Sequence, residues 1–236
     1  MVRDGAVRVE RSCAVRSDDI AAEERFTGVR MLCIALPLDS FAAEPGPWSP
    51  GTLSAMDLPT FRYHPDPLAT GSVAHSGATC RCCGKARGFI YTGPVYSSEE
   101  DLDSALCPWC IADGSAAQRF SAEFVDRPGI GGYGEWEPVP TAVLDEVSSR
   151  TPGFSGWQQE QWWTHCGDAA EFLGVAGSEE LQHQWAGAIP AIQETMRYGF
   201  TEWDVYLTAL DRDHGPSAYV FQCRHCGQLG GYSDHH

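Results

Sequence analysis

Hydrophobic and polar positions along the chain predict strands near two cysteine-rich stretches and helices between them. β-Branched and aromatic residues flank a Thr-Gly-Pro turn in GFIYTGPVY (88–96) and predict a short β-hairpin. Apolar residues at three- and four-residue spacing predict helices in 141–150, 156–174, 178–197 and 201–213, with Pro190 kinking or dividing the third. SAYVFQCRHCGQLGGYSD (217–234) is strand-like on both sides of a Cys-x-x-Cys-Gly turn. The predicted fold class is therefore α+β.

The first 55 residues differ from the rest in pattern. They show no sustained helical or strand period, end in the breaker-rich AAEPGPWSPGTLSA, and contain Cys13 and Cys33 without partner spacing. We interpret residues 1–55 as an N-terminal extension, either disordered or the product of a misassigned start, since Met56 opens a protein-like sequence. Residues 56–236 are predicted to form one zinc-binding domain.

Charge and hydropathy restrict the partners and the cellular location that we expect for the protein. The formal charge is −16, and the cationic residues are spread along the chain, which disfavours nucleic acid as a partner. No run of about eighteen apolar residues exists, and charged residues interrupt the N-terminal stretch where a signal peptide needs an apolar core, so we expect no membrane insertion and a cytoplasmic protein. In that reducing compartment, cysteines are metal ligands or redox groups more often than disulfides.

The cysteines carry the strongest chemical signal. Three Cys-x-x-Cys pairs occur among ten cysteines, whereas random placement would give about 0.4 pairs. The spacing lets a tight turn aim two thiolates at one Zn²⁺. Cys80, Cys83, Cys107 and Cys110 are expected to form a closed structural zinc site in a treble-clef-like order of knuckle, β-hairpin and helix. Cys82, between the first two ligands, is interpreted as a spare thiol.

The third pair, Cys223 and Cys226, needs further ligands from elsewhere in the chain. Cys166 is the natural third ligand; His165 or His225 could complete the shell, and water or a distant His is the alternative. Two zinc ions are therefore expected. Three protein ligands and a water would support Lewis-acid chemistry, whereas a closed shell would tie the C-terminal strand-knuckle-strand element to the helical middle region.

Other motifs carry weaker signals. CPWC (107–110) at a helix start could be a redox dithiol, but the preceding segment is not the strand that such motifs follow. His64 and Asp66 could transfer protons, although such residues more often cap turns. Trp157, Trp162 and Trp163 are expected in the core, and GIGGYG (129–134) is expected to be a flexible turn.

Five segments together resemble the CbrC family of bacterial proteins: LPTFRYHPDPLATGSV, CRCCGKARGFIYTGPVY, LCPWCIADGSAA, RTPGFSGWQQEQWWTHCGD and CRHCGQLGGYSD. The resemblance covers residues 58–234 and implies a small cytosolic protein without an established activity, one member being associated with tolerance to an E-group colicin. It carries over the seven cysteines already assigned as ligands.

Three hypotheses of function follow from the sequence. The first is a zinc-stabilised protein-interaction module whose acidic surface engages a protein partner, with a link to colicin tolerance or stress. The second is a zinc hydrolase with an open ion at Cys166, Cys223 and Cys226 and Asp168 or His165 as proton carrier. The third is thiol-disulfide activity of CPWC. The fourth ligand at the second site discriminates the first two, and no catalytic residue is assigned.

Overall fold

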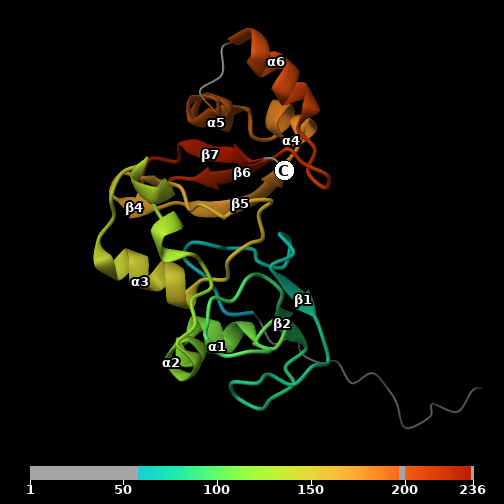
Figure 1. The fold of residues 1–236 in the computed structure, drawn as a ribbon, viewed down its shortest axis with the longest axis vertical. Helices are drawn as coiled ribbons and strands as arrows, with labels where there is room; N and C mark the ends of the chain where they lie inside the picture. The colour runs from blue at the N-terminus through green and yellow to red at the C-terminus, as the bar shows by residue number, and fades with distance from the viewer. Residues whose placement is uncertain (1–57, 197–199, 235–236) are drawn as a thin grey trace, which may run out of the picture. The chain divides into compact units, whose positions relative to one another are not determined.

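The computed structural model describes residues 58–196 and 200–234 of the chain (Figure 1). Residues 1–55, with Cys13 and Cys33, lie outside the described residues. By its contacts the chain divides into residues 1–51 and 52–236, and the fold below is that of the second unit. The predicted boundary at residue 55 stays a prediction.

The described part is a mixed α+β structure with small antiparallel sheets, as the sequence predicts. The strands are β1 (Val73–His75), β2 (Phe89–Tyr91), β3 (Thr164–His165), β4 (Asp168–Ala169), β5 (Glu171–Ala176), β6 (Ser217–Gln222) and β7 (Leu229–Asp234). The helices are α1 (Pro108–Ala112), α2 (Ser115–Phe120), α3 (Thr141–Arg150), α4 (Ser178–His183), α5 (Ile189–Met196) and α6 (Phe200–Ala209). Short 3-10 helices are η1 (Arg127–Gly129), η2 (Gly132–Gly134) and η3 (Ala186–Ala188).

A three-stranded antiparallel sheet in the order β5-β6-β7 organises the C-terminal part. Side chains of the central strand β6 alternate between its two faces, as the pleat requires. Tyr219 and Phe221 point into an aromatic cluster with Phe154, Trp162 and Phe172, whose Phe154 and Phe172 rings stack 4.0 Å apart. Both faces are covered, so β6 is almost continuously buried.

The other face of this sheet is covered by helices α4, α5 and α6 (Figure 1). Ala218 and Val220 of β6 point to this side and pack with Leu181, Ile192 and Trp203. Burying these apolar side chains supplies the main stabilisation of the layer, because burial contributes about 25 cal/mol per Å² of apolar area. Among the described residues, we find no helix with the length and apolar character needed to cross a bilayer.

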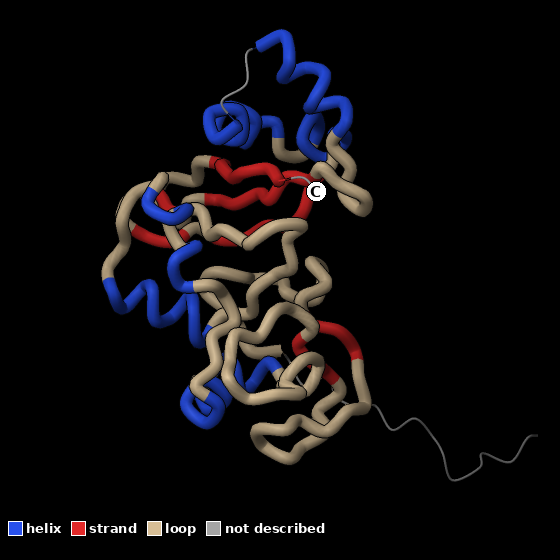
Figure 2. The backbone as a smooth tube through the Cα atoms, in the orientation of Figure 1, coloured by secondary structure: helices blue, strands red, loops and turns tan. Residues whose placement is uncertain are grey.

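The region around β1 and β2 has few regular elements and is mostly loop (Figure 2). Its hydrophobic cluster contains Cys80, Cys107 and Cys110 among apolar side chains such as Phe61 and Leu106. A β-hairpin is present, but it is built by other residues than predicted: β2 pairs with the upstream β1, Val73 opposite Tyr91. The first Cys-x-x-Cys turn therefore lies inside the hairpin connection. Thr-Gly-Pro does not close a hairpin, since the chain beyond it pairs Tyr96 with Glu123.

One helix prediction was wrong. Residues 156–174 form a loop followed by β3, β4 and most of β5 instead of a helix. The pattern of Trp162, Trp163 and Phe172 fits a helical period, but these aromatic residues enter a common core from an extended chain. The burial of β5 alternates strictly from Glu171 to Ala176, which is the period of a strand.

The other helix predictions agree with the structure. Helix α3 has the predicted bounds, and the segment 178–197 is divided into α4, η3 and α5, with Pro190 in the first turn of α5. The helix expected to start at CPWC is present as α1, and Gly114, with φ 77°, separates it from α2. Two of the three tryptophans expected in the core are buried, whereas Trp157 is 42% exposed.

Candidate metal centres

Four thiols from two separate segments meet in the β1–β2 region. Cys80 and Cys83 lie in the hairpin connection, Cys107 is the residue before helix α1, and Cys110 lies in its first turn. Their sulfur atoms all lie within 4.8 Å of one another. We call these four residues the first cluster. Three of them are buried, and Cys83 is intermediate.

Three sulfur–sulfur distances in the first cluster match those of a tetrahedral zinc site and are too long for disulfides. The Sγ–Sγ distances are 3.9 Å for Cys80–Cys110, 3.8 Å for Cys83–Cys107 and 3.6 Å for Cys107–Cys110. Four sulfurs at 2.3 Å from a Zn²⁺ would be about 3.8 Å apart, whereas a disulfide needs about 2.05 Å. The described cysteines are free thiols. The donor set therefore fits a zinc ion.

Both Cys-x-x-Cys-Gly turns have the same backbone structure. The N–H of Cys80 donates to Lys85 O and that of Gly84 to Cys80 O; the N–H of Cys223 donates to Gln228 O and that of Gly227 to Cys223 O. Gly84 and Gly227 have φ values of 69° and 74°, where a side chain is strained. The sequence thus builds two matching knuckles locally.

Backbone donors and burial shift the pKa values of the thiols in the first cluster in opposite directions. Burial raises the pKa of the Cys80 thiol, but N–H groups of Cys83, Cys107 and Cys82 point at its sulfur, and the net effect lowers the pKa to about 7. The Cys107 N–H is 3.2 Å from that sulfur. Burial and the neighbouring sulfurs raise the pKa of Cys107 to about 11 and that of Cys110 well above its usual value. A helix-start redox thiol needs the opposite shift.

A second group of four donors lies between two hairpins. His165 Nδ1 and the sulfurs of Cys166, Cys223 and Cys226 all lie within 4.8 Å of one another. We call these residues the second cluster. Cys166 and Cys226 are exposed, His165 is intermediate and Cys223 is buried. His165 Nδ1 is 3.3 Å from Cys166 Sγ and 3.5 Å from Cys226 Sγ. One nitrogen and one sulfur bound to the same Zn²⁺ would be about 3.6 Å apart, so this set fits zinc as well.

The adjacent residues His165 and Cys166 both reach the second cluster because a tight turn joins β3 to β4. The pairing of His165 with Asp168 leaves Cys166 and Gly167 as a two-residue loop with φ values of 54° and 70°. Positive φ at both positions is typical of a type I′ turn. On the helix that the sequence predicts here, such neighbours would be poor joint ligands. Gly167 was the only local signal for this turn, because a positive φ at the non-glycine residue Cys166 is uncommon.

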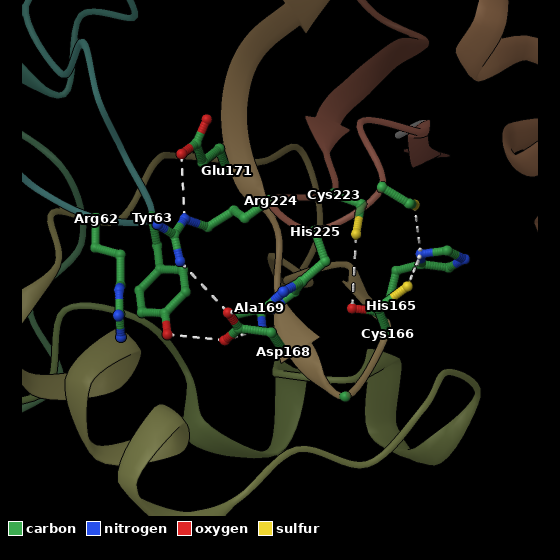
Figure 3. A network of polar contacts seen from close by, with 12 residues as sticks. Arg62, Tyr63, His165, Cys166, Asp168, Ala169, Glu171, Cys223, Arg224 and His225 are labelled. Atoms are coloured by element: carbon green, nitrogen blue, oxygen red, sulfur yellow. Dashed lines mark hydrogen bonds and ion pairs between the residues drawn. The ribbon is translucent and has the colours of Figure 1, made fainter.

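Asp168 joins the two halves of the second cluster (Figure 3). It follows the turn that carries Cys166, and its carboxylate lies 3.0 Å from His225 Nε2 and 3.4 Å from Arg224 Nη1, both residues of the opposing knuckle. The Tyr63 hydroxyl donates to Oδ1 at 2.8 Å. Burial raises the pKa of Asp168, but these donors and the Arg224 charge hold it below its usual value. The sequence indicates Asp168 only as a proton carrier, because this joining role depends on tertiary contacts.

The remaining candidate residues have other surroundings. His225 contacts Asp168 and is outside the second cluster, so His165 is the histidine of that group. Cys82 Sγ points to Ser115 Oγ at 3.6 Å and is outside the first cluster. Asp66 Oδ1 accepts the Ala69 N–H in a turn, whereas His64 is buried against Phe172 and Trp162. These two residues form no proton-transfer pair with each other at a cleft.

Relatives of the chain are found in bacteria of different genera, Mycobacterium and Pseudomonas. The UPF0167 protein Mb2317 of Mycobacterium bovis is 45% identical over 188 residues, which are 78% of this chain and 96% of that protein. The UPF0167 protein PA1536 of Pseudomonas aeruginosa is 45% identical over 171 residues, 72% of this chain and 93% of that protein. No solved structure matches the chain. The model of the "Uncharacterised protein family (UPF0167)" matches residues 58–235, and the chain therefore belongs to this family.

Proposed function

We propose that the protein is a zinc-binding interaction module that holds two structural zinc ions, one in each cluster. Cys80, Cys83, Cys107 and Cys110 would bind the first ion, and His165, Cys166, Cys223 and Cys226 the second. Thiolates with one imidazole are a donor set typical of structural zinc. The zinc ions would fix the loop-rich β1–β2 region and the β3–β4 turn, and the acidic surface would meet a protein partner.

The observation that carries this proposal is the spacing of the donor atoms. Each cluster brings four side-chain donors within 4.8 Å, and the first has sulfur separations of 3.6–3.9 Å. Thiolates so close in one small volume would repel one another without a cation, since like charges at this range oppose ionisation. A divalent ion compensates that repulsion in both clusters.

The same geometry weighs against the two enzymatic hypotheses. The hydrolase hypothesis needs a zinc position left to water, but His165 Nδ1 lies beside the two exposed thiols as a fourth donor. The thiol-disulfide hypothesis needs an accessible thiol with a lowered pKa in CPWC, but Cys107 is buried and its pKa is raised. The link to colicin tolerance rests on the CbrC resemblance alone and stays a prediction, as does a cytoplasmic location.

Metal content tests the proposal directly. Protein purified under reducing conditions without chelator is expected to contain two zinc ions per chain by native mass spectrometry. Replacing zinc with Co²⁺ should give the visible absorption bands of tetrahedral cobalt–thiolate sites. A content of one or zero zinc ions in fully reduced, folded protein would refute the two-site proposal.

A further inference from the structure

An acidic hollow with aromatic walls lies beside the second cluster. Its volume is about 420 Å³, and it is bounded by Trp136, Trp163, His165, Glu135, Glu137 and Glu194, among others. This size is within the range of about 300–1,000 Å³ for ligand sites. None of the described residues that line it is Lys or Arg. We infer that this hollow binds the cationic side chain, arginine above all, of a protein partner.

Contacts within the protein hold one wall of the hollow in place without a ligand. Trp163 stacks on the His165 ring at 5.1 Å with an interplanar angle of 13°. Gly230 also lies against the Trp163 ring, since a Cβ at Gly230 would be 2.3 Å from it. The second zinc site thus positions one wall through His165. A rigid wall lowers the entropy lost on binding.

Another part of the lining comes from residues 135–137, which follow the glycine-rich stretch 129–134, and for that stretch the sequence predicts a flexible turn. Its backbone is instead anchored: Gly131 N–H donates to Trp162 O, and Trp136 N–H donates to Gly131 O, each at 3.0 Å. Glu137 accepts the Gly167 N–H through Oε2 at 3.0 Å and the Thr164 hydroxyl through its carbonyl at 2.6 Å. These bonds hold Trp136 and Glu137 at the rim of the hollow.

The chemistry of the lining selects a cation. Trp163 is buried, but Trp136 is partly exposed, and its indole can attract a guanidinium or ammonium group while carboxylates at the rim supply the opposite charge. Arginine fits best, because its planar group can stack on an indole while donating to carboxylates in pairs.

The length of the acidic track favours a side chain of a partner over a small free amine. A second hollow of about 440 Å³ shares Glu135, Trp136 and Thr195 with the first and continues the track. The chain as a whole carries a charge of −16, which would draw a basic segment towards it. This inference rests on the proposed interaction module and names the chemistry of its partner.

Two peptides serve as probes. The first has two arginines among glycine and serine, and the second has neutral citrulline in place of both arginines. At about 0.15 M salt, where long-range attraction is screened, the arginine peptide should bind the zinc-loaded protein at least about tenfold more tightly by calorimetry. Equal binding of both peptides would overturn the inference. Spermidine binding in place of the arginine peptide would overturn the assignment to a partner side chain.

Two double variants with equal net charge distinguish binding in the hollow from a general attraction to the acidic protein. Glu135→Gln with Glu194→Gln should weaken arginine-peptide binding about tenfold, whereas Glu99→Gln with Glu100→Gln, which line neither hollow, should change it less than about twofold. Equal losses in the two variants would refute a specific site. Trp136→Leu, which keeps apolar packing without the ring, should also cost about tenfold.

The zinc content of each variant distinguishes a failure of this inference from a failure of the proposed function. Two zinc ions with no arginine preference would refute the hollow alone. An arginine preference that depends on Trp136 in protein with fewer than two zinc ions would refute the two-zinc proposal and leave the hollow standing.

Discussion

The two clusters share a knuckle but differ in their surroundings. Cys80–Gly84 and Cys223–Gly227 make the same backbone hydrogen bonds, yet the first cluster is mostly buried among apolar side chains, whereas two of the four donor residues of the second are exposed. The first knuckle lies among loops and short elements, and the second joins two six-residue strands that pair along their whole length. The same local motif therefore contributes to the hydrophobic core of the β1–β2 region, whereas in the C-terminal part it connects two strands that already pair with each other.

The comparison predicts that losing one ligand has unequal consequences. Structural zinc contributes on the order of 10 kcal/mol to folding, comparable to the whole stability of a domain. Cys107→Ser should therefore give insoluble or molten protein, because little else orders its loops. Cys226→Ser should retain a folded protein with one zinc ion, since the β6–β7 pairing persists. Near-ultraviolet circular dichroism and zinc content measure both outcomes.

Cys82→Ser is the matched control for Cys107→Ser. Its sulfur lies in the same hydrophobic cluster but outside the donor group, so two zinc ions and an unchanged spectrum are expected. If Cys82→Ser unfolds the protein and Cys107→Ser does not, the ligand assignment is wrong. If Cys226→Ser unfolds it as thoroughly as Cys107→Ser, the contrast between the clusters fails.

The same contrast explains what the sequence could predict. Each knuckle is specified by consecutive residues, and both were predicted together with α3, α6 and the flanking strands β6 and β7. The partner of β2 and the joint approach of His165 and Cys166 depend on pairing between distant or misassigned segments. Because the tryptophan-rich stretch 156–174 was predicted to be a helix, the β3–β4 turn was not predicted. Local spacing thus predicts ligands in pairs, whereas the composition of a complete site depends on tertiary structure.

A smaller effect is expected from the carboxylate that joins the halves of the second cluster. Asp168→Asn removes the charge that Arg224 and His225 of the knuckle contact, while side-chain size is kept. Loss of a residue that bonds a metal ligand typically weakens metal affinity about 10–100-fold. Asp168 bonds knuckle residues beside the donors instead of the donors themselves, so a loss of about tenfold is expected. Competition with a chromophoric chelator should show this loss for one zinc ion and an unchanged affinity for the other.

Glu171→Gln is the control for Asp168→Asn. Glu171 also accepts from Arg224, at 3.1 Å, but it has no bond to His225 and does not follow the turn that carries Cys166. Its effect on zinc affinity should be less than about threefold, because exposed ion pairs contribute at most about 1 kcal/mol. Equal effects of the two variants would assign the coupling to Arg224 alone.

The smallest effect compares the same substitution in both knuckles. Gly84→Ala and Gly227→Ala each place a Cβ at positive φ, and no atom lies within 4 Å of either Cβ position, so the strain of about 1–2 kcal/mol is the same. Gly84 is exposed, but Cys80 and Cys82 of the first knuckle are buried and should let it relax less, so Tm should fall by about 2–4 °C per kcal/mol. The exposed second knuckle can loosen around its zinc, so its affinity should fall about tenfold while Tm changes by less than about 2 °C. Calorimetric melting and chelator competition on both variants measure the difference. Equal shifts in Tm would show that the two knuckles support the fold alike, despite their unequal burial.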